Sequence, residues 1–228
     1  MIKGIAFDLE GTIVDLEKLH HDAHLELFRR VGLNLSIEEA ISKIEHFVGG
    51  PGEKIMEDVQ NLGYRYMSID EMLKIDQELY ERQLYRKKIF PREGFLEVLQ
   101  TIKDLEIPFS IGSLTPSDKA IFILKESGLC NYFTNDKIIL KEDVQNLKPS
   151  PDVYLETARR MGIKSEEQLV FEDSHNGIKA AISAGSKAIG MPVYNNSFIL
   201  NRLKEAGAYE IFLGWKELNV SQLIEGKI

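Results

Sequence analysis

Near its N-terminus the 228-residue chain reads IAFDLEGT over residues 5–12. An apolar tripeptide, Ile5 to Phe7, ends abruptly at two carboxylates, Asp8 and Glu10, and a Gly-Thr pair follows. Short, continuously apolar runs are typical of strands that are buried on both faces of a parallel sheet. The segment therefore predicts a buried strand with acidic side chains at its carboxyl end.

The same pattern, a short apolar run that stops at polar residues, recurs along the chain. It predicts further strands at residues 109–111, 138–140, 169–171, 188–190 and 211–213. Helix signals lie between these runs: Thr115 before Pro116 and Ser150 before Pro151 predict helix starts, and Gly128, Gly162 and Gly185 predict helix ends. Strands that alternate with helices predict an α/β fold with a doubly wound, Rossmann-like parallel sheet.

Residues 16–88 break this alternation. They contain no convincing strand pattern, and apolar residues such as Met72, Ile75 and Leu79 recur at helical spacing. We expect an inserted helical cap domain over residues 16–88, with the α/β core formed by residues 1–15 and 89–228. The sequence GGPG at residues 49–52 predicts a loop within the insertion.

Composition narrows the class of protein. The chain has 28 Lys and Arg against 36 Asp and Glu, a formal charge of −8, which disfavours nucleic acid as a partner. No apolar run approaches the roughly 20 residues of a membrane helix, and Asp8 and Glu10 interrupt any signal-like stretch. The single cysteine, Cys130, fits a reducing compartment. We expect a cytoplasmic enzyme with no nucleic-acid or membrane partner, and a monomer is favoured.

Ligands of open α/β sheets bind beyond the carboxyl ends of the strands. The polar residues predicted there are Asp8, Glu10, Ser113, Lys148, Glu172 and Asp173. Crowded carboxylates repel one another unless a hard cation lies among them, and Mg²⁺ prefers oxygen ligands. A lysine and a hydroxyl are groups that bind phosphoryl oxygens. The residues alone therefore predict a metal-assisted phosphoryl site.

In order along the chain, four segments resemble the motifs of the haloacid dehalogenase-like hydrolases. They are residues 8–12 (DLEGT), Ser113, Lys148 with Pro149, and residues 172–177 (EDSHNG). The insertion resembles the small helical cap of the branch that includes phosphoglycolate phosphatases, sugar phosphatases and β-phosphoglucomutase. The resemblance implies a phosphoric monoester hydrolase that needs Mg²⁺ and acts on a small phosphorylated metabolite through an aspartyl-phosphate.

The resemblance also implies a role for each residue. Asp8 is the expected nucleophile, and Glu10 is the expected general acid and base. The phosphoryl oxygens are expected on Ser113, Leu114 and Lys148. The expected metal ligands are Asp8, the backbone carbonyl of Glu10, Asp173 and Glu172, the last alternatively a partner of Lys148.

Glu10 departs from the usual Asp-x-Asp motif of the family. Its pKa in model peptides is close to that of aspartate, about 4.3 against 3.9, so the same proton transfers are available. The extra methylene moves the carboxylate, and a shift of about an ångström can cost roughly a hundredfold in rate. Enolase-phosphatases of the same superfamily carry Asp-x-Glu-Gly-Thr, so the motif still fits.

For the insertion, the resemblance places His20 near the hinge of the cap and in reach of the general acid. The segment 49–54 is the expected specificity loop, with Gly50 allowing close approach and Lys54 offering a charge. An alternative is a phosphomutase of the β-phosphoglucomutase kind, although Gly52 stands where such mutases place an arginine. A phosphonoacetaldehyde hydrolase would need a cap lysine, and Lys54 is one place out of register.

Less specific interpretations remain for single residues. Taken alone, Asp8 also fits a turn residue, and Asp173 a helix cap. Thr115 competes with Ser113 as the phosphate-binding hydroxyl. From a different class, a non-catalytic binding module on the same fold stays open, because fold does not settle function.

Overall fold

The computed structural model describes residues 1–225, which fall into two compact units. We call residues 1–15 together with the chain from Lys88 onward the core unit, and residues 16–87 the helical unit. Each is described by itself. The core unit has the α/β architecture that the sequence predicts.

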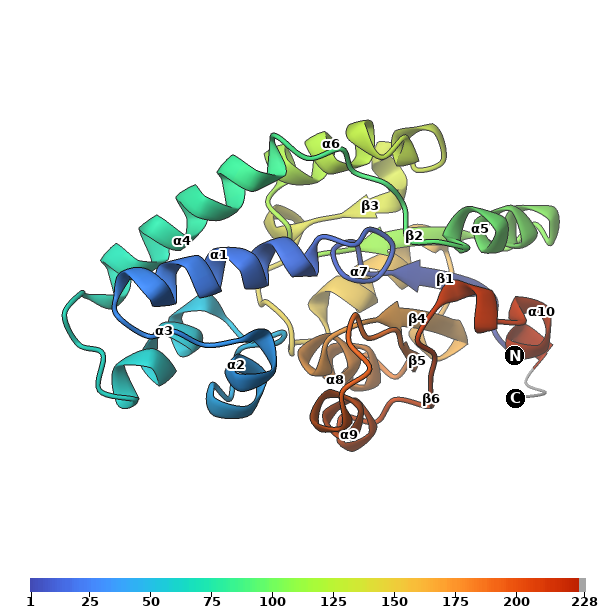
Figure 1. Cartoon of the computed structure of the whole chain (residues 1–228). Helices are drawn as coiled ribbons and strands as arrows, with labels where there is room; N and C mark the ends of the chain where they lie inside the picture. The colour runs from blue at the N-terminus through green and yellow to red at the C-terminus, as the bar shows by residue number, and fades with distance from the viewer. Residues whose placement is uncertain (226–228) are drawn as a thin grey trace. The chain divides into compact units, whose positions relative to one another are not determined.

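The core unit is built on a parallel sheet (Figure 1). In the described residues the sheet has six strands in the order β3-β2-β1-β4-β5-β6. The strands are β1 (Gly4–Phe7), β2 (Phe109–Gly112), β3 (Ile138–Ile139), β4 (Gln168–Glu172), β5 (Lys187–Gly190) and β6 (Glu210–Ile211). The chain moves outward one way from β1 to β3 and the other way from β4 to β6. The strand order therefore reverses between β1 and β4, which is where such sheets bind ligands.

The register of the central strands brings their carboxyl ends to one level. Phe7 of β1 pairs with Ile111 of β2 and with Phe171 of β4. The next residues along β1, β2 and β4 are Asp8, Gly112 and Glu172, respectively. These three positions consequently lie side by side at one edge of the sheet.

Helices follow the strands. They are α5 (Phe95–Asp104), α6 (Ser117–Glu126), α7 (Asp152–Met161), α8 (His175–Ser183), α9 (Ser197–Glu205) and α10 (Val220–Glu225). Because side chains alternate along a strand, β1 shows which face each helix covers. Gly4 lies against Met161 at the end of α7, whereas Phe7, three positions on, packs edge-on against Phe95 of α5. Helices α5 and α7 therefore cover opposite faces, as in a doubly wound sheet.

Two predicted helix starts are displaced. Helix α6 begins at Ser117 with Pro116 at its N-cap position, so Thr115 is not the cap. Helix α7 begins at Asp152, with Pro151 at the N-cap position. In both cases the proline occupies the N-cap position, whereas we expected it at the first position of the helix. The predicted ends hold, since Gly128 and Gly162 have the left-handed conformation.

The helical unit contains four helices, all within residues 16–87, which the structure describes completely. They are α1 (Glu17–Arg30), α2 (Ile37–Lys43), α3 (Gly52–Asn61) and α4 (Ile69–Leu84). Ser36 and Ser68 begin α2 and α4 with reciprocal capping boxes. The expected loop at residues 49–52 is one residue shorter than predicted, because Pro51 occupies the N-cap position and Gly52 starts α3.

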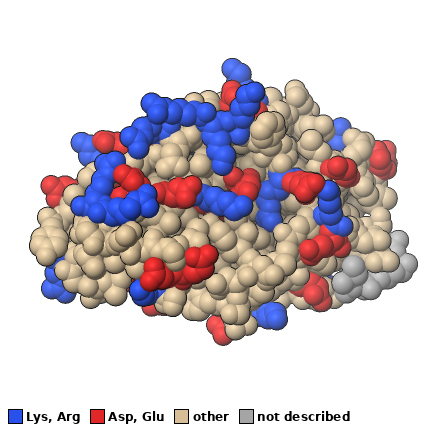
Figure 2. Space-filling model, viewed as in Figure 1, with Lys and Arg blue, Asp and Glu red and all other residues tan. Residues whose placement is uncertain are grey.

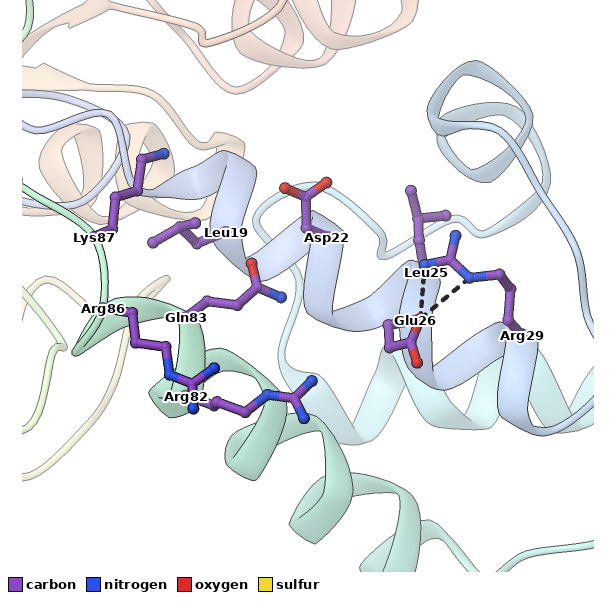
Figure 3. A pocket seen from close by; sticks show the side chains of 9 residues that line it. All are labelled: Leu19, Asp22, Leu25, Glu26, Arg29, Arg82, Gln83, Arg86 and Lys87. Atoms are coloured by element: carbon purple, nitrogen blue, oxygen red, sulfur yellow. Dashed lines mark hydrogen bonds and ion pairs between the residues drawn. The ribbon is translucent and has the colours of Figure 1, made fainter.

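A surface groove of about 750 Å³ lies between α1 and α4 of the helical unit (Figure 3). Its lining residues are Leu19, Asp22, Leu25, Glu26, Arg29, Arg82, Gln83, Arg86 and Lys87. Arg29 pairs with Glu26 at 2.8 Å, and Arg82 of α4 lies beside Arg86, which follows the end of this helix. Lys and Arg side chains gather over this part of α4 in Figure 2. The groove gives the helical unit a locally basic surface in an acidic chain.

Among the helices of the described chain, none combines the length and the apolar character that crossing a membrane requires.

Aromatic side chains fill the core beneath the carboxyl end of β1. Trp215 is 1% exposed, and its ring centroid lies 5.8 Å from that of Phe7, 5.1 Å from Phe95 and 5.0 Å from Phe171. Its indole N–H donates to the carbonyl of Thr12 at 3.0 Å. Trp215, to which the sequence assigns no role, thus anchors the turn that follows β1.

We expect Trp215→Phe to lower the free energy of unfolding by about 2–4 kcal/mol, because it opens a cavity and leaves the buried Thr12 carbonyl without its donor. Trp215 is the single tryptophan, so unfolding should be followed by circular dichroism in urea. Ile121→Val, at a side chain that is 63% exposed, is the control and should change stability by less than about 0.5 kcal/mol. A loss below about 1 kcal/mol for Trp215→Phe would contradict the anchoring role.

Candidate active site

The site is centred on Asp8, the first residue after β1. Its backbone N–H donates to the carbonyl of Phe171 at 3.0 Å, which extends the β1–β4 ladder by one bond. The residue is buried, 8% exposed, and Oδ1 accepts from Lys148 Nζ at 2.6 Å. The sheet therefore fixes the backbone of Asp8, and Lys148 fixes its carboxylate.

Lys148 reaches the carboxyl ends of all three central strands. Nζ lies 2.6 Å from Asp8 Oδ1, 2.6 Å from Glu172 Oε1 and 3.0 Å from the carbonyl of Gly112. These three acceptors match the three N–H donors of an ammonium group. The lysine thus joins β1, β2 and β4 at the edge where the predicted site residues meet.

Glu172 is held from several sides. Oε1 accepts from Lys148 and from the hydroxyl of Tyr154 at 2.7 Å, and Oε2 accepts from the backbone N–H of Ser174 at 3.2 Å and from its hydroxyl at 3.1 Å. A Cβ at Gly177 would overlap with the Glu172 carboxylate. Residue 177 must therefore be glycine for Glu172 to adopt this position, which gives a physical reason for the last residue of the EDSHNG segment.

Asp173 lies against the turn after β1. Its Oδ1 is 3.4 Å from the hydroxyl of Thr12, which donates to it. Gly11 has a φ of +84°, and a Cβ there would overlap with the Asp173 carboxylate. Both the conformation and the close approach require glycine, so Gly11 brings the first and last motifs together.

The three buried acids form a group that fits a metal ion. Asp8, Glu172 and Asp173 each offer one carboxylate oxygen, and these oxygens all lie within 4.8 Å of one another. Carboxylate oxygens are the ligands that hard divalent cations such as Mg²⁺ prefer. The side chain of Glu10, by contrast, is not in this group. Its predicted contribution is a backbone carbonyl.

Burial dominates the electrostatics. It raises the pKa of Asp8 to about 8, with the negative charges of Glu172 and Glu10 adding to the effect and the nearby Lys148 ammonium opposing it. Burial lowers the pKa of Lys148, but Asp8 and Glu172 outweigh it, so that the pKa is raised and the ammonium stays charged. Burial, with the charges of Glu172 and Asp8, also raises the pKa of Tyr154 and keeps its hydroxyl protonated. Asp8 and Glu172 thus share the single ammonium group of Lys148.

Glu10 and the residues after β2 form a hydrogen-bonded chain. Thr115 donates its hydroxyl proton to Glu10 Oε1 at 2.6 Å, and its Oγ1 lies 2.9 Å from Ser113 Oγ. The backbone N–H of Thr115 donates to Ser113 Oγ at 3.2 Å. Leu114, between them, is half-buried and has only its backbone to offer a phosphoryl group. The two candidate phosphate-binding hydroxyls, Ser113 and Thr115, are thus hydrogen-bonded to each other.

The expected cap residues lie in the helical unit. His20 is on α1, where its ring stacks on Tyr80 with 3.8 Å between the centroids. Gly50 packs so tightly on His46 that a Cβ would overlap with the His46 backbone. Lys54 was expected on a loop, but it lies in the first turn of α3 and pairs with Glu57 at 2.7 Å. That expectation was wrong because the helix starts before Lys54 rather than after it.

Arg92 is a residue of this region that the sequence analysis missed. Its Nη1 donates to the carbonyls of Gly11 at 2.6 Å and Met191 at 2.7 Å, and its Nη2 donates to that of Leu213 at 3.1 Å. Burial lowers its pKa, while the charge of Asp173 opposes this. One arginine thus ties together the loops after β1, β5 and β6. A lone arginine outside every motif carries no local signal of such a role.

Comparison with known proteins agrees with this geometry. The model of the haloacid dehalogenase-like hydrolase family matches residues 5–191. Fructose-1-phosphate phosphatase of Escherichia coli (strain K12) is 29% identical over 188 residues, which cover 82% of this chain and 94% of the relative. Phosphorylated carbohydrates phosphatase of Thermotoga maritima is 26% identical over 224 residues, which cover 96% of this chain and 98% of the relative.

The fold has close structural neighbours as well. The crystal structure of a conserved haloacid dehalogenase-like protein of unknown function from Agrobacterium tumefaciens str. C58 aligns with a TM-score of 0.84 at 25% identity, over 100% of this chain and 99% of the other. The resemblance read from the four motifs is confirmed. From its sheet topology, its motifs and the match over residues 5–191, the chain belongs to the haloacid dehalogenase-like hydrolases.

Proposed function

We propose that the protein is a Mg²⁺-dependent phosphatase that hydrolyses a small phosphorylated metabolite through an aspartyl-phosphate. The observation that carries the proposal is the meeting of Asp8, Glu172 and Asp173 with Lys148 at the point where the strand order reverses. A nucleophilic carboxylate, a set of hard oxygen ligands and an ammonium group are the parts that phosphoryl transfer requires.

In the first step, a carboxylate oxygen of Asp8 forms a bond to phosphorus, and the bond from phosphorus to the leaving oxygen breaks. Glu10 gives its proton to that oxygen. In the second step, Glu10 takes a proton from water, the water oxygen attacks phosphorus, and the acyl–phosphate bond breaks to return the Asp8 carboxylate and inorganic phosphate. The turn at Ser113 and Leu114, together with Lys148, borders the phosphoryl group in both steps.

The metal site of this proposal consists of Asp8, Asp173 and the backbone carbonyl of Glu10. Glu172 lies in the same acidic group, but its hydrogen bonds to Lys148, Tyr154 and Ser174 make it foremost a partner of the lysine. When bound, Mg²⁺ supplies positive charge that offsets the repulsion between the nucleophile and an anionic phosphoryl group. Thr12 and Gly11 position Asp173 for this role.

We assign the substrate to the phosphorylated carbohydrates, because two relatives that match more than four-fifths of the chain are named for that class. In this proposal residues 16–88 form a cap that recognises the leaving group, with His20, Gly50 and Lys54 as its candidate residues, and the enzyme works as a cytoplasmic monomer. A phosphomutase is the second candidate. The glycine at position 52, where such mutases carry an arginine, favours hydrolysis.

Hydrolysis of p-nitrophenyl phosphate tests the proposal. We expect phosphate release that requires Mg²⁺ and stops when a chelator is added, and we expect Asp8→Asn to reduce the rate by at least roughly a thousandfold, because an amide is not a nucleophile. Asp104→Asn, at an exposed acid of α5, is the matched control and should keep the wild-type rate. An inactive wild-type protein, or an Asp8→Asn variant within tenfold of it, would favour the non-catalytic module.

The raised pKa of Asp8 predicts how the stability of the metal-free protein depends on pH. The unfolded chain releases the Asp8 proton near its ordinary pKa of 3.8, whereas the folded protein keeps it until about 8. Because the folded state then holds more protons than the unfolded state, stability falls as pH rises through this window. We expect Asp8→Asn, which removes the charge, to raise the melting temperature in chelator, and more so at about pH 8 than at about pH 5.

The same melting experiment reports on the metal. Mg²⁺ should raise the melting temperature of the wild-type protein by binding only the folded state, and Asp173→Asn should largely abolish that rise. Asp104→Asn should respond to pH and to Mg²⁺ like the wild type. An Asp8→Asn variant that melts below the wild type at pH 8 in chelator would show that the Lys148 contact outweighs the burial of the Asp8 charge.

Replacement of Glu10 by glutamine tests its role. The amide neither donates nor accepts the required proton, so Glu10→Gln should slow turnover of an alkyl phosphate by about 10² to 10⁴. The rate of the first step with p-nitrophenyl phosphate should fall less, because p-nitrophenolate leaves without protonation. Wild-type turnover of an alkyl phosphate by Glu10→Gln would remove Glu10 from the mechanism.

A further inference from the structure

The carboxylate of Glu10 accepts a hydrogen bond from the hydroxyl of a residue that lies outside the four motifs. Thr115 Oγ1 donates to Glu10 Oε1 at 2.6 Å, a distance typical of a strong hydrogen bond between a hydroxyl and a carboxylate. Thr115 is 7% exposed, and it lies in the turn between β2 and α6. It belongs to the core unit, as does Glu10, so the contact is internal to one compact unit.

The direction of the hydrogen bonds around Thr115 follows from counting protons. A threonine hydroxyl has one proton, and here that proton goes to Glu10. The 2.9 Å contact between Ser113 Oγ and Thr115 Oγ1 must then be donated by Ser113. Ser113 Oγ in turn accepts the backbone N–H of Thr115. In this arrangement Ser113 donates its proton to Thr115.

The length of Glu10 matches this partner. An aspartate at position 10 would be shorter by one methylene, roughly 1.3 Å of reach along the chain. With the backbone unchanged, its carboxylate would lie roughly 4 Å from Thr115 Oγ1, which is beyond hydrogen-bond distance. The Thr115 contact thus depends on glutamate, the residue by which this chain departs from the usual motif.

We propose that Thr115 is the positioning residue of Glu10, and that the hydroxyl of Ser113 supports Thr115 in this role. The proposal rests on the proposed function, in which Glu10 transfers protons to and from the leaving oxygen and water. Thr115 holds the longer glutamate side chain in one rotamer, and the hydroxyl of Ser113 fixes the rotor of Thr115. Misplacement of a catalytic group by about an ångström can cost roughly a hundredfold in rate, so the loss of this contact has a measurable effect.

The first test compares leaving groups. In Thr115→Val, a near-isosteric change that removes the hydroxyl, kcat/KM for an alkyl phosphate should fall about 10- to 100-fold. For p-nitrophenyl phosphate, whose leaving group needs no proton, kcat/KM should fall less than about threefold. Thr115→Ser restores the donor and should recover most of the loss. Ser110→Ala removes another buried hydroxyl of the same strand region, bonded to the Lys137 carbonyl at 2.8 Å, and should not change the ratio between the two substrates.

The second test asks whether the effect runs through Glu10. In a Glu10→Asp background the hydroxyl has no carboxylate in reach, so adding Thr115→Val should change kcat/KM for the alkyl phosphate by less than about threefold. A loss that is equal for both substrates, or equal in both backgrounds, would overturn the proposal, because a general structural defect behaves in that way.

A third measurement tests the contact between Thr115 and Glu10 independently of phosphatase activity. The same four proteins, wild type, Thr115→Val, Glu10→Asp and the double variant, should show non-additive unfolding constants in urea. Hydrogen bonds to charged groups couple two residues by about tenfold or more in such a cycle. Coupling in a protein without phosphatase activity would retain the Thr115–Glu10 contact and reject the proposed function. Additive effects in an active phosphatase would reject the positioning role alone.

Discussion

The buried ammonium of Lys148 is the contact on which the rest of the site depends. It holds Asp8 and Glu172 at 2.6 Å each and caps the end of β2 through Gly112, so the three central strands converge on one positive charge. Burial of a charged group is costly unless it is paired and its hydrogen bonds are satisfied. Here each donor of the lysine has an acceptor, and Tyr154 and Ser174 complete the hydrogen bonds of the Glu172 carboxylate.

The charge balance of this cluster explains why the site is suited to a divalent cation. Three carboxylates, Asp8, Glu172 and Asp173, meet one ammonium group. If all are ionised, two negative charges remain, which is the charge that one Mg²⁺ neutralises. Burial raises the pKa of Asp8 and the charge of Glu172 adds to the rise, so that without a cation the protein keeps a proton on Asp8 instead. Gly11 and Gly177 allow the carboxylates to approach this closely, because any side chain would occupy their space.

Local patterns in the sequence predicted the strands and the acids at their ends because both depend on adjacent residues. A buried strand requires an unbroken apolar run such as residues 5–7, and its end is marked by the first charge. The helix starts at Pro116 and Pro151 were displaced, because a proline can occupy either the N-cap or the first helical position and the sequence does not distinguish them. The structural roles of Thr115 and Arg92 could not be predicted from the sequence for another reason. The contact of Thr115 with Glu10 spans 105 residues and that of Arg92 with Gly11 spans 81, so only the folded chain shows them.

Arg92 has a consequence for the dynamics of the core unit. Its guanidinium restrains three loops at once, because it donates hydrogen bonds to the carbonyls of Gly11, Met191 and Leu213. These residues follow β1, β5 and β6. Opening any one of these loops removes a bond from the group that restrains the other two. Segments that share a restraint in this way open as one cooperative unit rather than one by one. Amide protons in the three loops should therefore exchange with solvent at a common rate, although Gly11 in the first loop and Leu213 in the last lie far apart along the chain.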